Sequence, residues 1–209
     1  IPGLLQTFDF NDREEPLAIH APSGTRGTIE DLVSVTGDTP SFPVRITQVS
    51  AGDTVLDGDG YEVRAIRTQH RCQSVGYAVV EDDRKGRFDR EKAEEQLGIE
   101  PGPKYSKLHR GESVEHEGRT IQPEEVVGPD RPGRTLIYTG DTRPTDAVVE
   151  ASEDADLLVH DATFADDWAE RARTTAHATG REAGEVAQEA GAKRLALTHI
   201  STRYGGNPR

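Results

Sequence analysis

Three residues with metal-binding side chains stand directly after predicted strands, where side chains project from the edge of a sheet. His70 follows the apolar run 61–68, Asp141 lies in a Gly-Asp turn after 135–138, and His199 follows 195–198. Neutral imidazoles and carboxylates bind catalytic zinc directly. One histidine in such a place is more often an ordinary turn residue. It is therefore the three residues together that predict a metal site.

A fourth position has the chemistry of a proton donor. His177 lies in the loop before a predicted helix that begins at Thr179. A helix N-terminus favours nearby negative charge such as phosphate, and an imidazole beside it can act as a general acid. Asp161, which follows the apolar run 157–160, could orient that imidazole. The alternative for His177 is a surface residue of the capping region.

Other catalytic motifs are missing from the sequence. It has no Gly-x-Gly-x-x-Gly before a helix, no Walker motif, no Cys-x-x-Cys and no Gly-x-Ser-x-Gly. Cys72 is the one cysteine, which excludes an intramolecular disulfide and fits a reducing cytoplasm. No apolar run approaches the ~18 residues of a membrane span. We therefore expect a cytoplasmic protein without a membrane segment.

The elements that must position these residues follow from the apolar pattern. Short β-rich runs at 17–20, 44–49, 61–68 and 75–80 predict strands. After residue 133 the runs change to strand 135–138, helix 145–152, strand 157–160, helix 179–190 and strand 195–198. This β-α-β-α-β order predicts an α/β layer with helices covering a sheet.

The helix over 179–190 has the most complete set of local signals. Thr179 and Glu182 have the spacing of a capping box, in which each side chain satisfies a free backbone N–H group of the first turn. Gly191 stands where a C-terminal stop is expected. An i, i+3, i+4, i+7 pattern places four apolar residues on one face: Ala183, Val186, Ala187 and Ala190.

The polar, turn-rich segment 84–132 stands between the two groups of strands. Residues 84–110 hold eight basic and five acidic residues, or +3, and include four of the five lysines. One interpretation is a solvated insertion with a short helix over 89–97. The other is an arm that contacts phosphates.

The composition limits the class of protein. The 209 residues have a length typical of one domain. A net charge of −13 argues against a protein that coats nucleic acid non-specifically. High acidity with few lysines is typical of proteins from halophiles. Because the chain begins with Ile1 and has no Met, we expect it to be part of a longer protein.

Taken together, these stretches resemble the ribonuclease Z family, the tRNA 3′-processing endonucleases of metallo-β-lactamase fold. Segment 69–77 is similar to the part of the family that carries a metal-ligand histidine, here His70. Segments 138–144 and 195–204 are similar to those of the bridging aspartate and the last ligand histidine. These fall on Asp141 and His199.

The same resemblance covers the proposed proton donor and the insertion. Segments 158–164 and 176–179 look like the pair that places a carboxylate beside the catalytic histidine, which implies roles for Asp161 and His177. Asp161 stands where the family usually has Glu. Segment 97–108 resembles the Gly-Pro part of the family's flexible arm, so 84–132 is expected to be the tRNA-binding arm. Its expected contact residues are Gly102, Pro103, Lys104, Lys107 and Arg110.

One part of the family pattern is absent. Segment 1–7 looks like the helix that follows the His-x-His-x-Asp-His signature, but the signature itself does not occur in the sequence. We therefore expect an α/β chain that forms a partial αββα sandwich, lacks the N-terminal part and carries an inserted arm. Such a piece is expected to have weak activity or none.

The resemblance implies a zinc-dependent endoribonuclease that removes the 3′ trailer from precursor tRNA and leaves a 3′-OH. It further implies two zinc ions bridged by Asp141, protonation of the leaving ribose oxygen by His177, and a homodimer. Halophilic archaea are the implied source. Two alternatives are another metallo-β-lactamase-fold phosphodiesterase or hydrolase acting on small molecules, and a non-catalytic RNA-binding relative.

Overall fold

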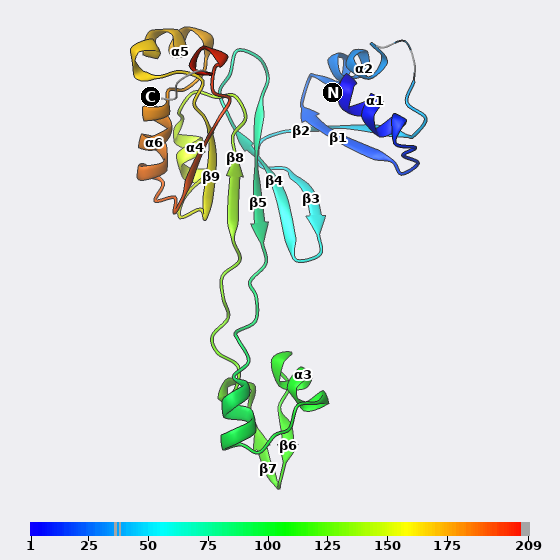
Figure 1. The fold of residues 1–209 in the computed structure, drawn as a ribbon, viewed down its shortest axis with the longest axis vertical. Coiled ribbons are helices and arrows are strands. Elements are labelled where there is room, and N and C mark those ends of the chain that lie inside the picture. The colour runs from blue at the N-terminus through cyan, green and yellow to red at the C-terminus, as the bar shows by residue number, and fades with distance from the viewer. Residues whose placement is uncertain (36, 38, 206–209) are drawn as a thin grey trace. The chain divides into compact units, whose positions relative to one another are not determined.

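The protein is described by a computed structural model that covers residues 1–35, 37 and 39–205 (Figure 1). It divides into two compact units. One unit comprises Ile1–Val80 and Thr135–Arg209, and the other comprises Glu81–Arg134. The predicted insertion 84–132 lies within the second unit. No helix of the described residues is both long and apolar enough to cross a membrane.

The first unit contains a six-stranded mixed sheet. Its strand order is β10-β9-β8-β5-β4-β3, and β8, β9 and β10 run parallel to one another. Strand β5 is antiparallel to β8, and β3 is antiparallel to β4. The strands are β3 (Thr54–Gly58), β4 (Tyr61–Arg67), β5 (Val75–Glu81), β8 (Thr135–Tyr138), β9 (Leu157–Asp161) and β10 (Leu195–Thr198).

The two predicted helices connect the parallel strands as α4 (Asp146–Ala151) and α6 (Gly180–Glu189), and a third helix that was not predicted, α5 (Ala169–Thr175), precedes α6. Ile137 and Leu158 from the sheet form one buried cluster with Val148 of α4 and Val186 of α6. The predicted capping box is confirmed, because the Thr179 hydroxyl accepts from the Glu182 amide at 3.1 Å and the Glu182 carboxylate accepts from the Thr179 amide at 2.8 Å.

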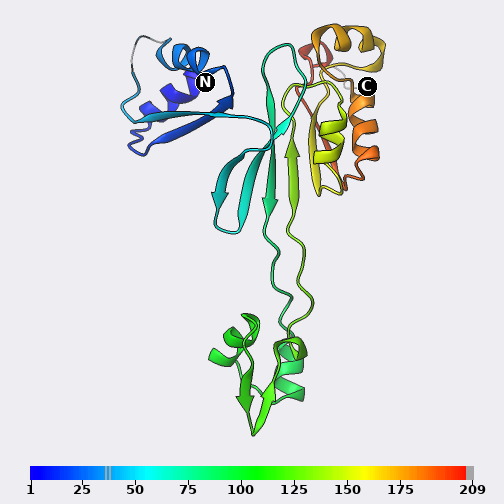
Figure 2. The same ribbon diagram turned by 180° about the vertical axis from the view of Figure 1, so that it is seen from behind.

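The N-terminal part of this unit forms a smaller sheet of its own (Figure 2). Strands β1 (Leu17–Pro22) and β2 (Val44–Val49) pair in parallel, with Leu17 opposite Val44. The helix expected at the start of the chain is present as α1 (Pro2–Phe10). Helix α2 (Arg26–Ser34) is not among the predicted elements. Its apolar residues Ile29, Leu32 and Val33 have i, i+3, i+4 spacing and are partly buried, but this pattern covers only five residues.

The second unit has its own hydrophobic core. It contains the π-helical turn η1 (Lys92–Gln96), α3 (Pro103–His109), β6 (Val114–His116), β7 (Arg119–Ile121) and the 3₁₀ turn η2 (Pro123–Glu125). Ile99, Leu108 and Ile121 are almost fully buried, and the rings of Phe88 and Tyr105 lie 4.4 Å apart. The expected short helix over 89–97 is thus a π-helical turn in its central part. The insertion is a folded unit with a core, not a solvated loop.

Candidate active site

Three of the predicted site residues lie at one edge of the sheet. Asp161 is the last residue of β9, and Asp141 and His199 come shortly after β8 and β10. The carboxyl ends of parallel strands meet at the same edge, which is where open α/β sheets place their sites. Sequence position alone therefore predicts their proximity, and the structure bears it out, since Asp141 Oδ2 lies 3.6 Å from His199 Nε2.

The loop of His70 reaches the same edge through backbone contacts. The Arg143 amide donates to the Gln69 carbonyl at 2.8 Å. In the reverse direction, the Gln69 amide donates to the Thr142 hydroxyl at 3.0 Å. These two bonds join the loop that follows β4 to the loop that carries Asp141, although the two are more than 70 residues apart in the chain.

His177 lies between the other two histidines. It follows helix α5 (Ala169–Thr175) and the left-handed residue Ala176, whose φ is +60°. Its ring centroid is 4.8 Å from that of His70 and 5.0 Å from that of His199. The predicted metal ligands and the predicted proton donor therefore form one cluster. A non-glycine residue with positive φ costs conformational energy, and such positions gather at functional sites.

Asp161 contacts His177 although its side chain is one carbon shorter than that of Glu. Asp161 Oδ2 lies 2.7 Å from His177 Nδ1, and the side chain of Asp161 is fully buried. The carboxylate also accepts from the Thr142 amide at 3.0 Å and from the Thr163 amide at 2.8 Å. A buried charge needs such donors, because desolvation would otherwise disfavour it.

The hydroxyl of Thr163 connects the acid to a second histidine, and sequence reasoning assigned it no role. It donates to Asp161 Oδ1 at 2.6 Å, so its lone pair is free to accept from His199 Nδ1 at 2.7 Å. It also lies 3.1 Å from His177 Nδ1. The sequence signal that could have identified Thr163 is its position two residues after Asp161, the carboxylate at the end of a strand.

These contacts determine which ring nitrogen of each histidine remains available. The Ala176 carbonyl accepts from His70 Nδ1 at 2.9 Å, so His70 Nε2 keeps its lone pair. By the same argument, the contact with Thr163 leaves His199 Nε2 free, and that atom faces Asp141. A metal-binding histidine characteristically donates its other N–H to an oxygen in this way.

The donor atoms are spaced closely enough to hold metal ions. Ligand atoms of His70, Asp141 and His177 lie within 4.8 Å of one another, and so do those of Asp161, His177 and His199. The donor set of imidazoles and carboxylates suits a divalent transition metal. His177 belongs to both groups, so spacing alone does not separate its role as a proton donor from that of a ligand.

An ion pair holds the His177 loop from outside the cluster. The Arg143 guanidinium donates to the His177 carbonyl and, through the same nitrogen, to Glu182 at 2.9 Å. The Arg143 side chain is only 18% exposed and the Glu182 side chain 20%. Burial would raise the pKa of Glu182, but the hydrogen bonds from Arg143 and the Thr179 amide outweigh it and lower this pKa below its usual value. From the sequence no role was predicted for Arg143, and Glu182 was predicted only as part of the capping box.

Replacing Arg143 tests how much this ion pair stabilises the unit. Arg143→Ala leaves the half-buried Glu182 without its main partner, so we expect a loss of about 2 kcal/mol in the free energy of unfolding. Urea unfolding at constant salt measures this loss. Arg173→Ala is the matched control, because the pair of Arg173 with Glu170 is exposed and should contribute little. Equal effects of the two substitutions would contradict the role given to Arg143.

The predicted arm residues are placed by α3 and differ in their availability. Gly102 precedes the helix and Pro103 begins it. Lys104 Nζ donates to the Glu115 carbonyl at 2.8 Å, and Arg110 pairs with Glu112 at 3.0 Å. Lys107 is exposed and has no ion pair among the described residues. Of the three predicted cations, Lys107 is thus the one without a partner among the described residues.

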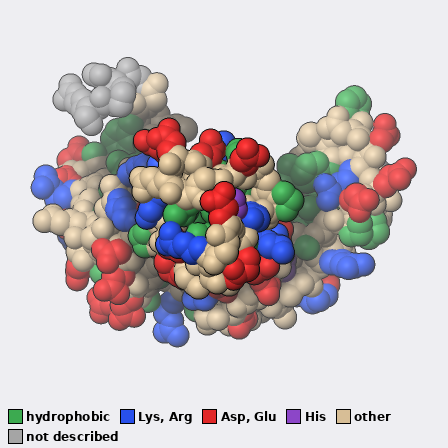
Figure 3. Space-filling model, turned by 90° about the horizontal axis from the view of Figure 1, so that it is seen from below, with side chains coloured by type: hydrophobic (Ala, Val, Ile, Leu, Met, Phe, Trp, Pro, Cys, Tyr) green, Lys and Arg blue, Asp and Glu red, His purple; other side chains and the backbone are tan. Residues whose placement is uncertain are grey.

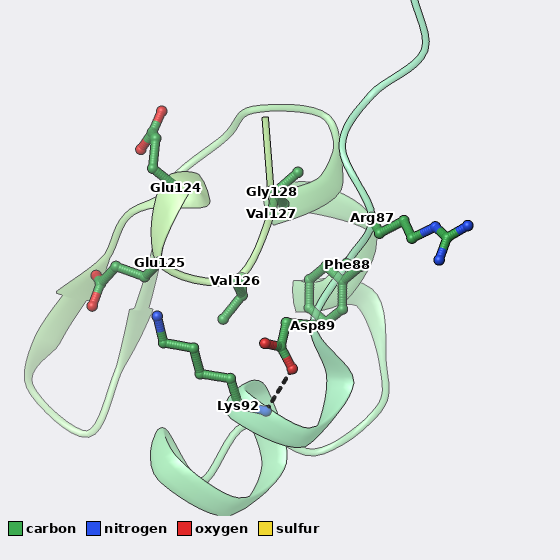
Figure 4. A pocket seen from close by; sticks show the side chains of 9 residues that line it. All are labelled: Arg87, Phe88, Asp89, Lys92, Glu124, Glu125, Val126, Val127 and Gly128. Atoms are coloured by element: carbon green, nitrogen blue, oxygen red, sulfur yellow. Dashed lines mark hydrogen bonds between the residues drawn. The ribbon is translucent and has the colours of Figure 1, made fainter. Parts of the chain in front are cut away.

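The charge of the second unit is mixed. Residues 81–134 contain 11 basic and 14 acidic side chains, a net charge of −3, so the excess of +3 is confined to 84–110. Basic and acidic side chains are interleaved on the face shown in Figure 3. This unit also has a pocket in which Phe88 and Val126 lie near Lys92 and Glu125, while the side chain of Arg87 points away (Figure 4). Any contact with RNA phosphates here must be local.

Comparison with known proteins assigns the chain to a family. Residues 101–200 match the model of the beta-lactamase superfamily domain. The chain is 72% identical over 207 residues to Ribonuclease Z of Haloarcula marismortui, which covers 99% of this chain and 67% of that protein. It is 61% identical to Ribonuclease Z of Halorubrum lacusprofundi, with 99% and 67% covered. The high acidity fits these halophilic relatives.

Solved structures show the same fold. The crystal structure of the short form of human tRNase Z matches with a TM-score of 0.63 and 24% identity, covering 98% of this chain and 68% of that one. The fold is therefore α/β of the metallo-β-lactamase type. The chain spans about two thirds of the length of the curated relatives it matches. On the identity and coverage of these relatives, the chain belongs to the ribonuclease Z family.

Proposed function

We propose that this chain is the larger part of an endoribonuclease that removes the 3′ trailer from precursor tRNA and leaves a 3′-OH on the tRNA. The observation that carries the proposal is the Asp161–His177 pair, joined at 2.7 Å beside the cluster of His70, Asp141 and His199. This is the arrangement that acid-assisted hydrolysis of a phosphodiester requires. Membership of the ribonuclease Z family supplies the substrate class.

The metal part of the proposal is two zinc ions held with the help of His70, Asp141 and His199. The hydrogen bonds on His70 Nδ1 and His199 Nδ1 support it, because each leaves Nε2 free as a ligand atom. Asp141 Oδ2 lies 3.6 Å from His199 Nε2 and shares a group with His70, as a bridging carboxylate would. Bound zinc supplies Lewis-acid polarisation of the phosphate and a water of lowered pKa.

Residues of the chain itself position the proton that the leaving group needs. Asp161 accepts from His177 Nδ1–H, so it is the doubly protonated ring, facing the Asp161 carboxylate, that carries a second proton on Nε2 and gives it to the leaving 3′ oxygen of the tRNA ribose. Thr163 and Thr142 keep the Asp161 carboxylate in place, and Arg143 holds the His177 backbone. The geometry thus supports a positioned general acid with a buried orienting carboxylate.

The second unit is proposed as the arm that grips the tRNA body, with Gly102, Pro103, Lys104, Lys107 and Arg110 as its contact residues. Folded RNA is recognised mainly by shape and by contacts to phosphate and 2′-hydroxyl groups, which suits a unit of mixed charge. We further propose that the enzyme is cytoplasmic and acts as a homodimer, as its family resemblance implies.

Deleting the arm separates this function from the alternative of a small-molecule hydrolase. Residues 84–132 can be replaced by Asn-Gly, because strands β5 and β8 are antiparallel neighbours with Val80 opposite Thr135. We expect precursor-tRNA cleavage to fall by about 100-fold or more, since the phosphate contacts that position the substrate are lost. Turnover of bis(p-nitrophenyl) phosphate should remain within about twofold, because no residue proposed for the reaction is removed.

The two substrates are compared on the same preparations at one zinc and salt concentration. Lys107→Ala in the intact chain is a milder companion variant that keeps the arm folded. Equal loss of both activities in the deletion variant would favour the small-molecule hydrolase and count against the tRNA endonuclease.

A further inference from the structure

We propose that Trp168 and Arg203 form a stacking subsite for an unpaired nucleobase of the RNA next to the cut. The inference rests on the proposed function, because it assigns part of the substrate to this surface. It is argued from the segment that follows His199 and from the turn η3 (Asp166–Trp168), to which the sequence analysis assigned no role.

The segment after His199 folds back onto the loop that carries Thr163. The Ser201 amide donates to the Thr163 carbonyl at 3.2 Å, and the Ala165 amide donates to the Tyr204 hydroxyl at 2.9 Å. These bonds place the 3₁₀ turn η4 (Thr202–Tyr204) against η3. The two turns are held together at the edge of the candidate site.

Arg203 stacks on two aromatic rings in this place. Its guanidinium carbon lies 4.4 Å from the ring centroid of Trp168 and 5.0 Å from that of Phe164. The Phe164 ring is in turn 6.2 Å from the ring of His177. Continuous contact therefore connects the proposed general acid, through Phe164 and Arg203, to Trp168.

The exposure of Trp168 and the charge of Arg203 distinguish these two residues from a buried packing contact. Trp168 is 44% exposed, whereas Phe164 is 6% exposed. Two neighbouring arginines are neutralised, since Arg181 pairs with Asp166 and Arg173 pairs with Glu170. Arg203 has no carboxylate partner among the described residues, and its Nε donates to the Ser201 hydroxyl at 3.0 Å. Arg203 thus presents an exposed guanidinium beside an exposed indole.

Single-stranded RNA supplies the chemistry that fits this surface. Unpaired bases stack on aromatic side chains and on guanidinium planes, while the backbone phosphate favours a nearby cation. The structural alternative is that the cation–π contact only fastens η4 to η3. If Trp168 and Arg203 form a subsite, RNA contacts the indole of Trp168; if they only join η4 to η3, it does not.

The sole tryptophan makes the subsite directly observable. Trp168 is the one tryptophan of the chain, so the intrinsic indole fluorescence reports on this position alone. Titration with a short single-stranded RNA of trailer sequence should quench that fluorescence in a saturable way. Arg203→Ala should weaken the binding several-fold, and the duplex form of the same RNA should quench far less.

Steady-state cleavage of precursor tRNA provides the second readout. Trp168→Ala should lower kcat/KM about tenfold, mainly through KM, whereas Trp168→Phe should retain most of the activity because it keeps a stacking face. Phe10→Ala is the matched control, because Phe10 is 88% exposed and belongs to α1. Two further substrates identify the stacked base: each carries an abasic nucleotide on one side of the cut. The substrate that lacks the stacked base should be cleaved with equal kcat/KM by Trp168→Ala and by the unaltered chain.

Two results would overturn the subsite. One is fluorescence that single-stranded RNA leaves unchanged, and the other is equal kcat/KM for Trp168→Ala and the unaltered chain. A merely structural contact would instead lower the urea midpoint of Trp168→Ala and Trp168→Phe alike without changing KM. If RNA quenches the fluorescence but the chain cuts no precursor tRNA even when the family's His-x-His-x-Asp-His segment is supplied, the proposed function fails while the subsite stands.

Discussion

His177→Ala is expected to lower the rate of precursor-tRNA cleavage by about 10²–10⁴-fold, the usual contribution of a positioned general acid. The imidazole is oriented by Asp161 at 2.7 Å, and its side chain is 14% exposed, so water replaces its proton poorly. Single-turnover cleavage of a 5′-labelled precursor measures the rate, with the family's His-x-His-x-Asp-His segment added to the chain in both variants. We expect the urea midpoint to change little, because no core residue is removed.

A modified substrate distinguishes a proton donor from a metal ligand. Sulfur at the bridging 3′ position leaves as a thiolate without protonation, so this substrate should restore most of the rate of His177→Ala. Zinc content measured by atomic absorption should stay equal to that of the unaltered chain. His177 belongs to both groups of candidate ligand atoms, so a loss of zinc together with no rescue would assign it to the metal instead.

Asp161→Ala should have the largest effect on stability of any substitution in the site. Removing the fully buried carboxylate leaves the amides of Thr142 and Thr163 and the Thr163 hydroxyl without their acceptor. Each unsatisfied buried donor costs about 1–3 kcal/mol, so a loss of about 3 kcal/mol or more in the free energy of unfolding is expected. Urea unfolding measures this loss.

Asp161→Asn separates orientation from stability. An amide has nearly the same shape, but its NH₂ group cannot accept from His177 Nδ1–H, so the ring loses its tautomer and orientation. Cleavage should fall by about 10²-fold or more while the unfolding midpoint drops less than in the Ala variant. Asp167→Asn, at an exposed position six residues further on, is the matched control. Cleavage by Asp161→Asn at the rate of the unaltered chain would contradict the orienting role.

Local pattern is sufficient for five of the six strands of the main sheet and for helices α4 and α6, whereas β3 and α5 were not predicted. Apolar runs of four to six residues, a capping box at Thr179 and a β-α-β-α-β order depend on neighbours in sequence, and the parallel strands β8, β9 and β10 follow from them. The edge position of Asp141, Asp161 and His199 follows as well, because parallel strands end on the same side. Helix α2 was not predicted, because its apolar pattern of Ile29, Leu32 and Val33 extends over little more than one turn.

The core of the inserted unit is a result of tertiary structure. Its buried residues, among them Ile99, Leu108 and Ile121, are spread over turns and short elements without one periodic pattern. Composition therefore indicates a polar insertion, while folding brings these scattered apolar side chains together. Folding of this unit also brings Lys104 Nζ to the Glu115 carbonyl, a contact that a count of charges does not reveal.

The connections within the site also depend on tertiary structure. That Asp161 reaches His177 in place of a longer glutamate depends on how closely α5 and β9 bring the two loops. Thr163 joins Asp161 to His199, and Arg143 joins the Asp141 loop to the His177 loop, across 36 and 34 residues of sequence. Residue types and strand ends identify the groups that can react. Which nitrogen keeps a lone pair, and which carboxylate is buried, is decided by hydrogen bonds between loops, and these form only when the sheet brings the loops to one edge.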